Sequence, residues 1–143
     1  MTSPKTTGQS MQFEDIRVGQ ALPPLDIPVT VTLIAGGAIA TRDYFPGHHD
    51  ADAARALGSP DVFMNILTTN ALVQRFVEQW SGPDARFKSV KIKLGAPNYP
   101  GDTLRLRGEV MVVDPVARSA ELRVSGKNGL GDHVSATVTL ALP

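Results

Sequence analysis

The sequence contains no cysteine, and this absence excludes thiol nucleophiles, disulfides and cysteine-ligated metal sites. It also lacks any apolar run that approaches the roughly 20 residues needed to span a bilayer. Neither charge is in excess, because fourteen basic side chains match fourteen acidic ones. This balance argues against a general electrostatic role on nucleic acid or on an anionic membrane. We therefore expect a cytoplasmic protein that binds neither nucleic acid nor membrane.

The length of 143 residues suits one domain with a substantial core, and 42% apolar with 20% charged residues is typical of a globular protein. Residues 1–10 carry one lysine, several serines and threonines, and no apolar segment. We expect them to form a disordered tail and not a signal peptide, and residues 11–143 to form a single domain.

The part of the domain that follows the tail predicts one strand and two short helices. Asp26–Leu33 alternates in polarity and is rich in β-branched side chains, which predicts a strand. The small apolar segment Ile34–Arg42 predicts a short helix. Ala51–Leu57 predicts a second one, with Asp50 as its N-cap and Gly58 as its end.

The longest predicted helix is Val62–Trp80, with Asp61 as its N-cap and Gly82-Pro83 as its stop. Apolar side chains fall on one side of this helix, and its first turns are apolar almost all round. A helix of this kind is usually covered by other elements.

From Arg86 onward the hydrophobic pattern changes to a period of two, which predicts four antiparallel strands. The predicted turns between them are 97–102, 114–115 and 127–132. One sheet curling around one central helix is the simplest way to bury both elements, and this arrangement is the α+β hot-dog fold. We expect a second copy or a partner to cover its exposed sheet edges.

Asp43 and His48 stand five residues apart across a Pro-Gly pair, and they are the leading candidates for chemistry. Pro46 fixes one φ angle and Gly47 permits a positive one, which predicts a bent loop that points both side chains at one volume. An acid and an imidazole so placed could hold a water and transfer protons near neutral pH. The alternative is an ordinary surface hydrogen bond. Because the adjacent His48 and His49 tend to point apart, we predict no metal site.

The segment from Asp43 to His48 resembles the signature Asp-x-Asn-Pro-(aliphatic)-His of the MaoC-like (R-specific) enoyl-CoA hydratases. The acid, the proline, the imidazole and their spacing are kept, whereas Phe45 replaces the asparagine and Gly47 the aliphatic residue. The family opens its central helix with a His-Gly pair whose glycine amide serves as oxyanion donor. Asn65-Ile66 stands at that place here.

Further segments resemble one subgroup of this family, the small subunits of actinobacterial steroid enoyl-CoA hydratases. These segments are residues 40–43, 48–50, 61–68, 72–76 and 129–137. The resemblance covers about residues 26–142. It implies an acyl-CoA substrate and no cofactor beyond the coenzyme A that the substrate carries. It also implies a larger MaoC-like subunit as partner in a heterotetramer, with a homodimer for the chain alone.

The resemblance implies hydration of a conjugated thioester by Asp43 and His48. Backbone amides at Asn65 and Ile66 would then face the enolate oxygen. We prefer His48 as the base that deprotonates water and Asp43 as the acid at the α-carbon, and the reverse assignment stays open.

The resemblance to the steroid subgroup implies a pocket for a bulky acyl group, and the two departures from the signature agree with it. Gly47 would free volume, and Phe45 would offer the substrate an apolar contact.

Other readings of the sequence remain. The chain could be a non-catalytic structural subunit that completes the pocket of a partner, or an acyl-CoA thioesterase, although the only carboxylate past the cap of the long helix is Glu78. Some of the predicted strands have basic faces, which carry Lys88, Lys91, Lys93, Arg105 and Arg107. These faces are either a solvated surface or a binding site for the phosphates of coenzyme A.

Overall fold

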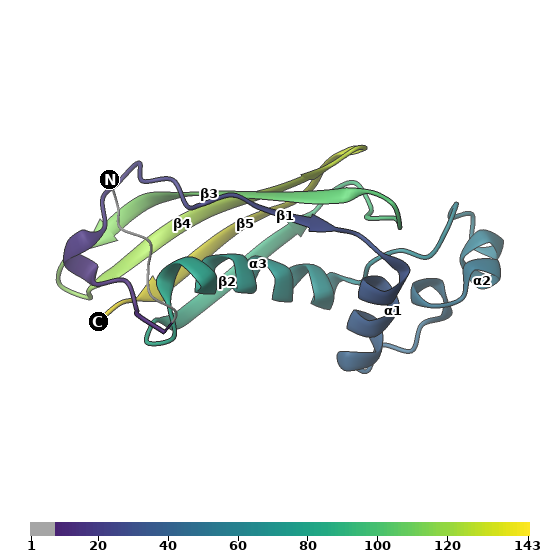
Figure 1. The fold of residues 1–143 in the computed structure, drawn as a ribbon, viewed down its shortest axis with the longest axis horizontal. Coiled ribbons are helices and arrows are strands. Elements are labelled where there is room, and N and C mark those ends of the chain that lie inside the picture. Colours follow the sequence, from purple (N-terminus) through teal and green to yellow (C-terminus); the bar gives the residue numbers. More distant parts are fainter. Residues whose placement is uncertain (1–7) are drawn as a thin grey trace.

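The computed structural model describes residues 8–143, which form one sheet with a long helix across it and three short helical segments at one end (Figure 1). Residues 1–7 of the predicted tail lie outside the described residues. In the described part of that tail, Ser10 contacts the domain, because its hydroxyl donates to Asp84 Oδ2 at 2.8 Å and accepts from the Asp84 N–H at 2.8 Å. Nearby, Phe13–Asp15 forms the 3₁₀ turn η1.

The sheet has five antiparallel strands in the order β1-β3-β4-β5-β2. Their bounds are β1 Leu25–Pro28, β2 Arg86–Leu94, β3 Thr103–Asp114, β4 Ser119–Asn128 and β5 Gly131–Ala141. The four strands predicted after residue 86 are thus confirmed. The short strand β1 and the longer strand β2 form the two edges of the sheet.

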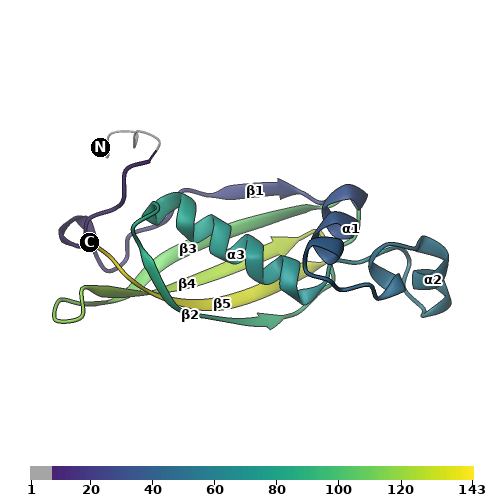
Figure 2. The same ribbon diagram turned by 90° about the horizontal axis from the view of Figure 1, so that it is seen from below.

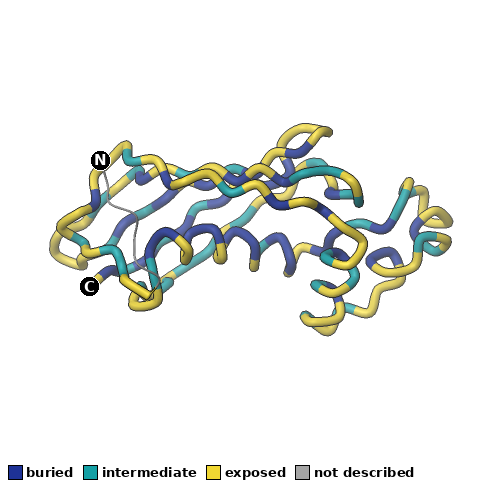
Figure 3. The backbone as a smooth tube through the Cα atoms, viewed as in Figure 1, coloured by how far each residue is buried: buried dark blue, intermediate teal, exposed yellow. Residues whose placement is uncertain are grey.

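The central helix α3, Ile66–Ser81, lies diagonally across one face of the sheet (Figure 2). One side of the helix is buried against the strands, whereas the opposite side is exposed (Figure 3). The helix ends at Gly82, which has a φ of 82°. Glycine adopts a positive φ without steric cost because it has no Cβ.

The core lies between α3 and the sheet, because alternate strand residues point at the helix. Its fully buried members come from both layers and include Val73, Val77, Leu104, Leu122 and Leu140. A helix packed on one antiparallel sheet confirms the predicted α+β hot-dog architecture.

The predicted strand Asp26–Leu33 is too long. The strand ends at Pro28, and Thr30 begins helix α1, Val31–Ala40, by accepting the Leu33 N–H at 3.0 Å. β-Branched residues favour a strand locally, and the capping bond at Thr30 overrides this preference. The helix that was expected to lead to Asp43 therefore exists, but it begins three residues earlier than predicted.

The predicted start of the long helix at Val62 is also wrong. Residues 62–64 stay outside the helix because Phe63 N–H donates to Gly47 O at 3.2 Å and Met64 N–H donates to Asn98 O at 3.2 Å. Asp61 accepts the N–H of the next residue and caps nothing further along the helix. The N-cap is Asn65, whose side chain accepts the Thr68 N–H.

Two further short elements follow α1 in the chain. Helix α2, Ala51–Ala56, has Asp50 as its N-cap, as predicted, and Gly58 follows its end with a φ of 92°. The turn η2, Pro46–His48, is 3₁₀. None of the helices within residues 8–143 has the length and apolar character that crossing a membrane requires.

Candidate active site

The loop between α1 and α2 carries both Asp43 and His48. Arg42 leaves the helix in the left-handed region with a φ of 57°, and Asp43 N–H donates to Ala38 O at 2.9 Å. The turn η2 then brings His48 back beside Asp43. Gly47 has no positive φ, so the predicted reason for this glycine is wrong.

The imidazole of His48 and the carboxylate of Asp43 are in direct contact, with 3.3 Å between Nε2 and Oδ2. The direct contact leaves no room between these two atoms for the water that we expected the pair to hold. On its other side, His48 Nδ1 lies 2.7 Å from Phe63 O. Because a carbonyl oxygen can only accept, Nδ1 must carry a proton there. Any proton shared with Asp43 therefore lies on Nε2 or Oδ2.

The surroundings of Asp43 stabilise its ionised form. Asn65 Nδ2 donates to Oδ2 at 3.0 Å, and Phe45 N–H donates to Oδ1 at 3.2 Å. These two hydrogen bonds, with a smaller contribution from the charge of His48, hold the pKa of Asp43 below its usual value. Asp43 is therefore a carboxylate at neutral pH.

Asn65 connects this carboxylate to the central helix. Its Oδ1 accepts the Thr68 N–H at 2.9 Å, while its Nδ2 donates both to Asp43 and to Thr41 Oγ1 at 3.0 Å. The sequence pointed to the backbone of Asn65 and missed its side chain and Thr41. The available signal was the residue type, because asparagine is among the preferred N-caps.

The N-terminus of α3 lies beside the Asp43–His48 pair. By helix geometry the N–H groups of Asn65, Ile66 and Leu67 have no partner within the helix, since Thr68 N–H is capped and Thr69 N–H donates to Asn65 O. The helix dipole adds partial positive charge at the same place. This terminus could receive a developing oxyanion.

Two phenyl rings border the His48 imidazole. The ring centroids of Phe45 and Phe63 lie 5.4 Å and 4.8 Å from it, both in edge-to-face geometry. Gly47 is buried behind them. A Cβ at Gly47 would lie 2.9 Å from each phenyl ring, so the volume that we expected this glycine to free is already filled. No pattern in the sequence pointed to a role for Phe63 beside His48.

A second buried histidine lies near the helix start and was not predicted to matter. His133 Nδ1 lies 2.6 Å from Ala96 O, and its Nε2 lies 2.8 Å from Thr69 Oγ1. Burial lowers the pKa of His133, although the bond to Ala96 acts in the opposite direction. The ring therefore stays neutral and joins β5 to α3.

The remaining predicted features lie outside this cluster. His49 is exposed, with Nε2 3.3 Å from Tyr44 O. No group of three or more metal-ligating side chains converges within residues 8–143. The five basic residues of the strand faces are exposed, and Arg107 pairs with Asp26 at 2.8 Å.

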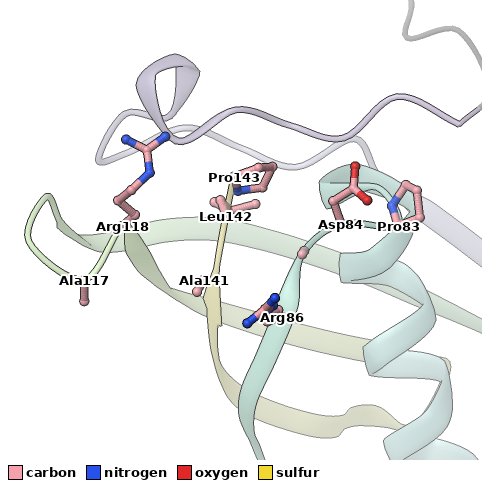
Figure 4. A pocket seen from close by; sticks show the side chains of 9 residues that line it. Pro83, Asp84, Arg86, Ala117, Arg118, Ala141, Leu142 and Pro143 are labelled. Carbon is pink, nitrogen blue, oxygen red and sulfur yellow. The ribbon is translucent and has the colours of Figure 1, made fainter.

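Two cavities lie at the other end of the molecule, near the C-terminus. One of about 710 Å³ is lined by Arg86, Arg118, Leu142 and neighbouring residues (Figure 4). The other lies beside Trp80. Neither is lined by Asp43 or His48.

Comparison with known proteins gives a consistent family. Residues 14–128 match the model of the MaoC-like domain. The chain is 47% identical over 125 residues to the 3-oxo-4,17-pregnadiene-20-carboxyl-CoA hydratase beta subunit of Mycobacterium tuberculosis, an alignment that covers 87% of this chain and 95% of that protein.

Solved structures share the fold. A chain of the ChsH1–ChsH2 complex from Mycobacterium tuberculosis matches with a TM-score of 0.86 and 46% identity, over 89% of this chain and 98% of that one. The R-hydratase PhaJ1 of Pseudomonas aeruginosa matches with a TM-score of 0.87 over 96% of this chain and 89% of that one. Its identity of 18% supports the fold alone.

Proposed function

The chain belongs to the MaoC-like domain family, and from this premise we propose that it is the catalytic subunit of an enoyl-CoA hydratase. The observation that carries the proposal is the contact of 3.3 Å between His48 Nε2 and Asp43 Oδ2 beside the N-terminus of α3. Hydration needs one group that accepts a proton from water and one that donates a proton to the α-carbon. It also needs positive charge at the thioester oxygen.

Asp43 and His48 act as one pair that shares a single proton. Because Nδ1 is fixed as the donor to Phe63 O, only Nε2 can exchange a proton with the substrate. The lowered pKa of Asp43 favours its carboxylate as the group that takes a proton from water. His48 Nε2–H then protonates the α-carbon while the hydroxide bonds to the β-carbon. Return of the proton from Asp43 to Nε2 restores the pair.

This assignment is the reverse of the one that we preferred from the sequence. A coupled pair has apparent pKa values that belong to both groups, so both orders were open. The hydrogen bonds from Asn65 and Phe45 support the carboxylate form of Asp43. They keep Asp43 ionised in the resting enzyme, so it has no proton to donate and has a free position for the proton of water.

The enolate oxygen is stabilised at the start of α3. The N–H groups of Ile66 and Leu67 belong to the first turn, where the helix leaves donors unpaired. Backbone N–H groups need no particular side chain, so Ile66 can stand where the family has glycine. The Ile66 side chain is exposed.

The acyl pocket is completed by a partner, for which we propose a larger MaoC-like subunit in a heterotetramer. Large apolar side chains are exposed on the elements that meet at the pair: Ile39 on α1, Phe45 on the loop, and Ile66 and Leu67 on α3. Exposed apolar groups gathered in one region are typical of an interaction surface. The matched crystal structure is itself a complex of two named components.

The proposed substrate is a bulky enoyl-CoA of the steroid side-chain type, because the relative with 47% identity is named for a pregnadiene carboxyl-CoA. Coenzyme A enters as part of this substrate, and no separate cofactor takes part. The thioesterase alternative finds no support, since Glu78 is exposed and lies in the last turns of α3, away from Asp43.

Reconstitution tests the proposal. The chain is purified alone and together with a larger MaoC-like subunit encoded near it, and hydration of crotonyl-CoA and of a steroid enoyl-CoA is compared as kcat/KM. We expect the complex to prefer the steroid thioester and the chain alone, as a homodimer, to hydrate it poorly. A preference for crotonyl-CoA would reject the steroid substrate and leave the chemistry standing. An inactive complex on both thioesters would reject the hydratase.

A further inference from the structure

The orientation of the His48 imidazole depends on more than its two hydrogen-bonding atoms. The His48 side chain is 9% exposed, and the rings of Phe45 and Phe63 meet its ring at interplanar angles of 65° and 77°. Edge-to-face contacts of this kind are favourable between aromatic rings. Together with the bond from Nδ1 to Phe63 O, they leave Nε2 facing Asp43.

Gly47 is required for space and not for backbone conformation. Its φ is not positive, so an alanine there would not strain the backbone. A Cβ would nevertheless lie 2.9 Å from Phe45 Cε1 and 2.9 Å from Phe63 Cε1, which is closer than real Cβ atoms approach. The backbone cannot retreat freely, because Gly47 O accepts the Phe63 N–H at 3.2 Å. The two rings can close on His48 only because residue 47 has no side chain.

We infer that Phe45 and Gly47 are a matched pair of positioning residues that holds His48 Nε2 against Asp43 Oδ2. Phe45 serves both members of the catalytic pair, since its ring borders the imidazole while its N–H donates to Asp43 Oδ1 at 3.2 Å. Gly47 supplies the volume that this ring and that of Phe63 occupy. The inference rests on the proposed hydratase function for its kinetic consequence. The arrangement of the rings does not depend on that function.

A four-protein cycle in the reconstituted complex tests the pairing: wild type, Gly47→Ala, Phe45→Ala and the double variant. Gly47→Ala should lower kcat by about 10²-fold with little change in KM, because small misplacement of a reacting group has effects of that size. In the Phe45→Ala background, Phe63 can move into the vacated volume. The added methyl group should then cost only about threefold, as expected for two coupled neighbours.

The matched control is Gly36→Ala. Gly36 lies in α1, and a Cβ there meets no atom within 4 Å, so this variant should keep wild-type kcat. An equal cost of Gly47→Ala in both backgrounds would overturn the pairing. A rise in KM with unchanged kcat would instead show that the two residues line the substrate pocket, and it would also overturn the inference.

The ¹⁵N NMR signals of the His48 ring give a readout that needs neither turnover nor the Gly47 variant to fold. At a pH high enough to remove the shared proton from Nε2, wild type should show the ring protonated on Nδ1 alone, and Phe45→Ala should show a mixture of the two neutral tautomers. An unchanged tautomer in Phe45→Ala, with an unchanged pH profile of kcat/KM, would refute the positioning role. If the wild-type complex fails to hydrate thioesters while the tautomer shifts as expected, the proposed function fails and the positioning of His48 stands.

Discussion

Asn65 Nδ2 donates to Asp43 Oδ2 at 3.0 Å, so the residue that caps the central helix also holds the carboxylate of the proposed catalytic pair. Phe63 lies two residues before Asn65, and its carbonyl oxygen accepts a hydrogen bond from His48 Nδ1. The short extended segment before α3 thus fixes both members of the pair. Its own position is fixed by hydrogen bonds to the η2 turn and to Asn98.

Replacing Asn65 with alanine should raise the pKa of Asp43, because the variant loses the largest of the interactions that lower it. Protonation of Asp43 would then occur at higher pH, and the acid limb of kcat/KM should move upward in pH. Loss of the cap should also destabilise the protein by about 1 kcal/mol. The measurements are a pH–rate profile and urea unfolding.

Asn65→Ser separates the two effects, because serine caps a helix well but its short side chain does not reach Asp43. We expect this variant to keep most of the stability and to show the same upward movement of the acid limb. An acid limb that stays in place in both variants would show that Asn65 does not control Asp43.

The β half of the molecule is predictable because alternation is a local signal, and strands β2 to β5 follow it closely. The start of α3 is not predictable in the same way. Residues 62–64 are apolar and compatible with a helix, and hydrogen bonds to Gly47 and Asn98, which are distant in the sequence, hold them outside it. The hydrogen bond between Asn65 and Asp43 joins residues 22 positions apart, and no periodic pattern in the sequence indicates it. Likewise, the sequence suggested that Gly47 serves a turn, whereas the structure requires a glycine there because the rings of Phe45 and Phe63 approach its Cα.

His133 should make the stability of the fold depend on pH. Burial lowers its pKa in the folded state below the ordinary 6.5, so the unfolded chain binds the proton first as pH falls. The stabilising contribution is therefore present above about pH 6.5 and is lost as pH falls through the folded-state pKa. Urea unfolding at several pH values should show this decrease in wild type and a smaller slope in His133→Gln.

The exposed His49 provides the control for this experiment. His49→Gln should retain the wild-type slope, because its ring is exposed in the folded chain. An equal slope in wild type and in His133→Gln would assign the pH dependence to other groups.

Two neighbouring glycines of α1 should respond oppositely to alanine. A Cβ at Gly37 would overlap the Thr68 side chain of α3, whereas a Cβ at Gly36 meets nothing. Gly36→Ala should stabilise the helix by up to about 1 kcal/mol. Gly37→Ala should destabilise the protein by about 1–3 kcal/mol through overpacking. Thermal unfolding of both variants checks the contact between α1 and α3, and equal shifts in Tm would show that these helices can separate without cost.

The most direct test of the proposed chemistry is the hydration rate of Asp43→Asn and His48→Ala in the reconstituted complex. Light scattering first establishes that each variant assembles as wild type does. If the two groups transfer the protons of hydration, each variant should lose about 10² to 10⁴-fold in kcat, the usual contribution of a general acid or base. Near-wild-type turnover in both variants, within intact complexes, would contradict the assignment of catalysis to this pair.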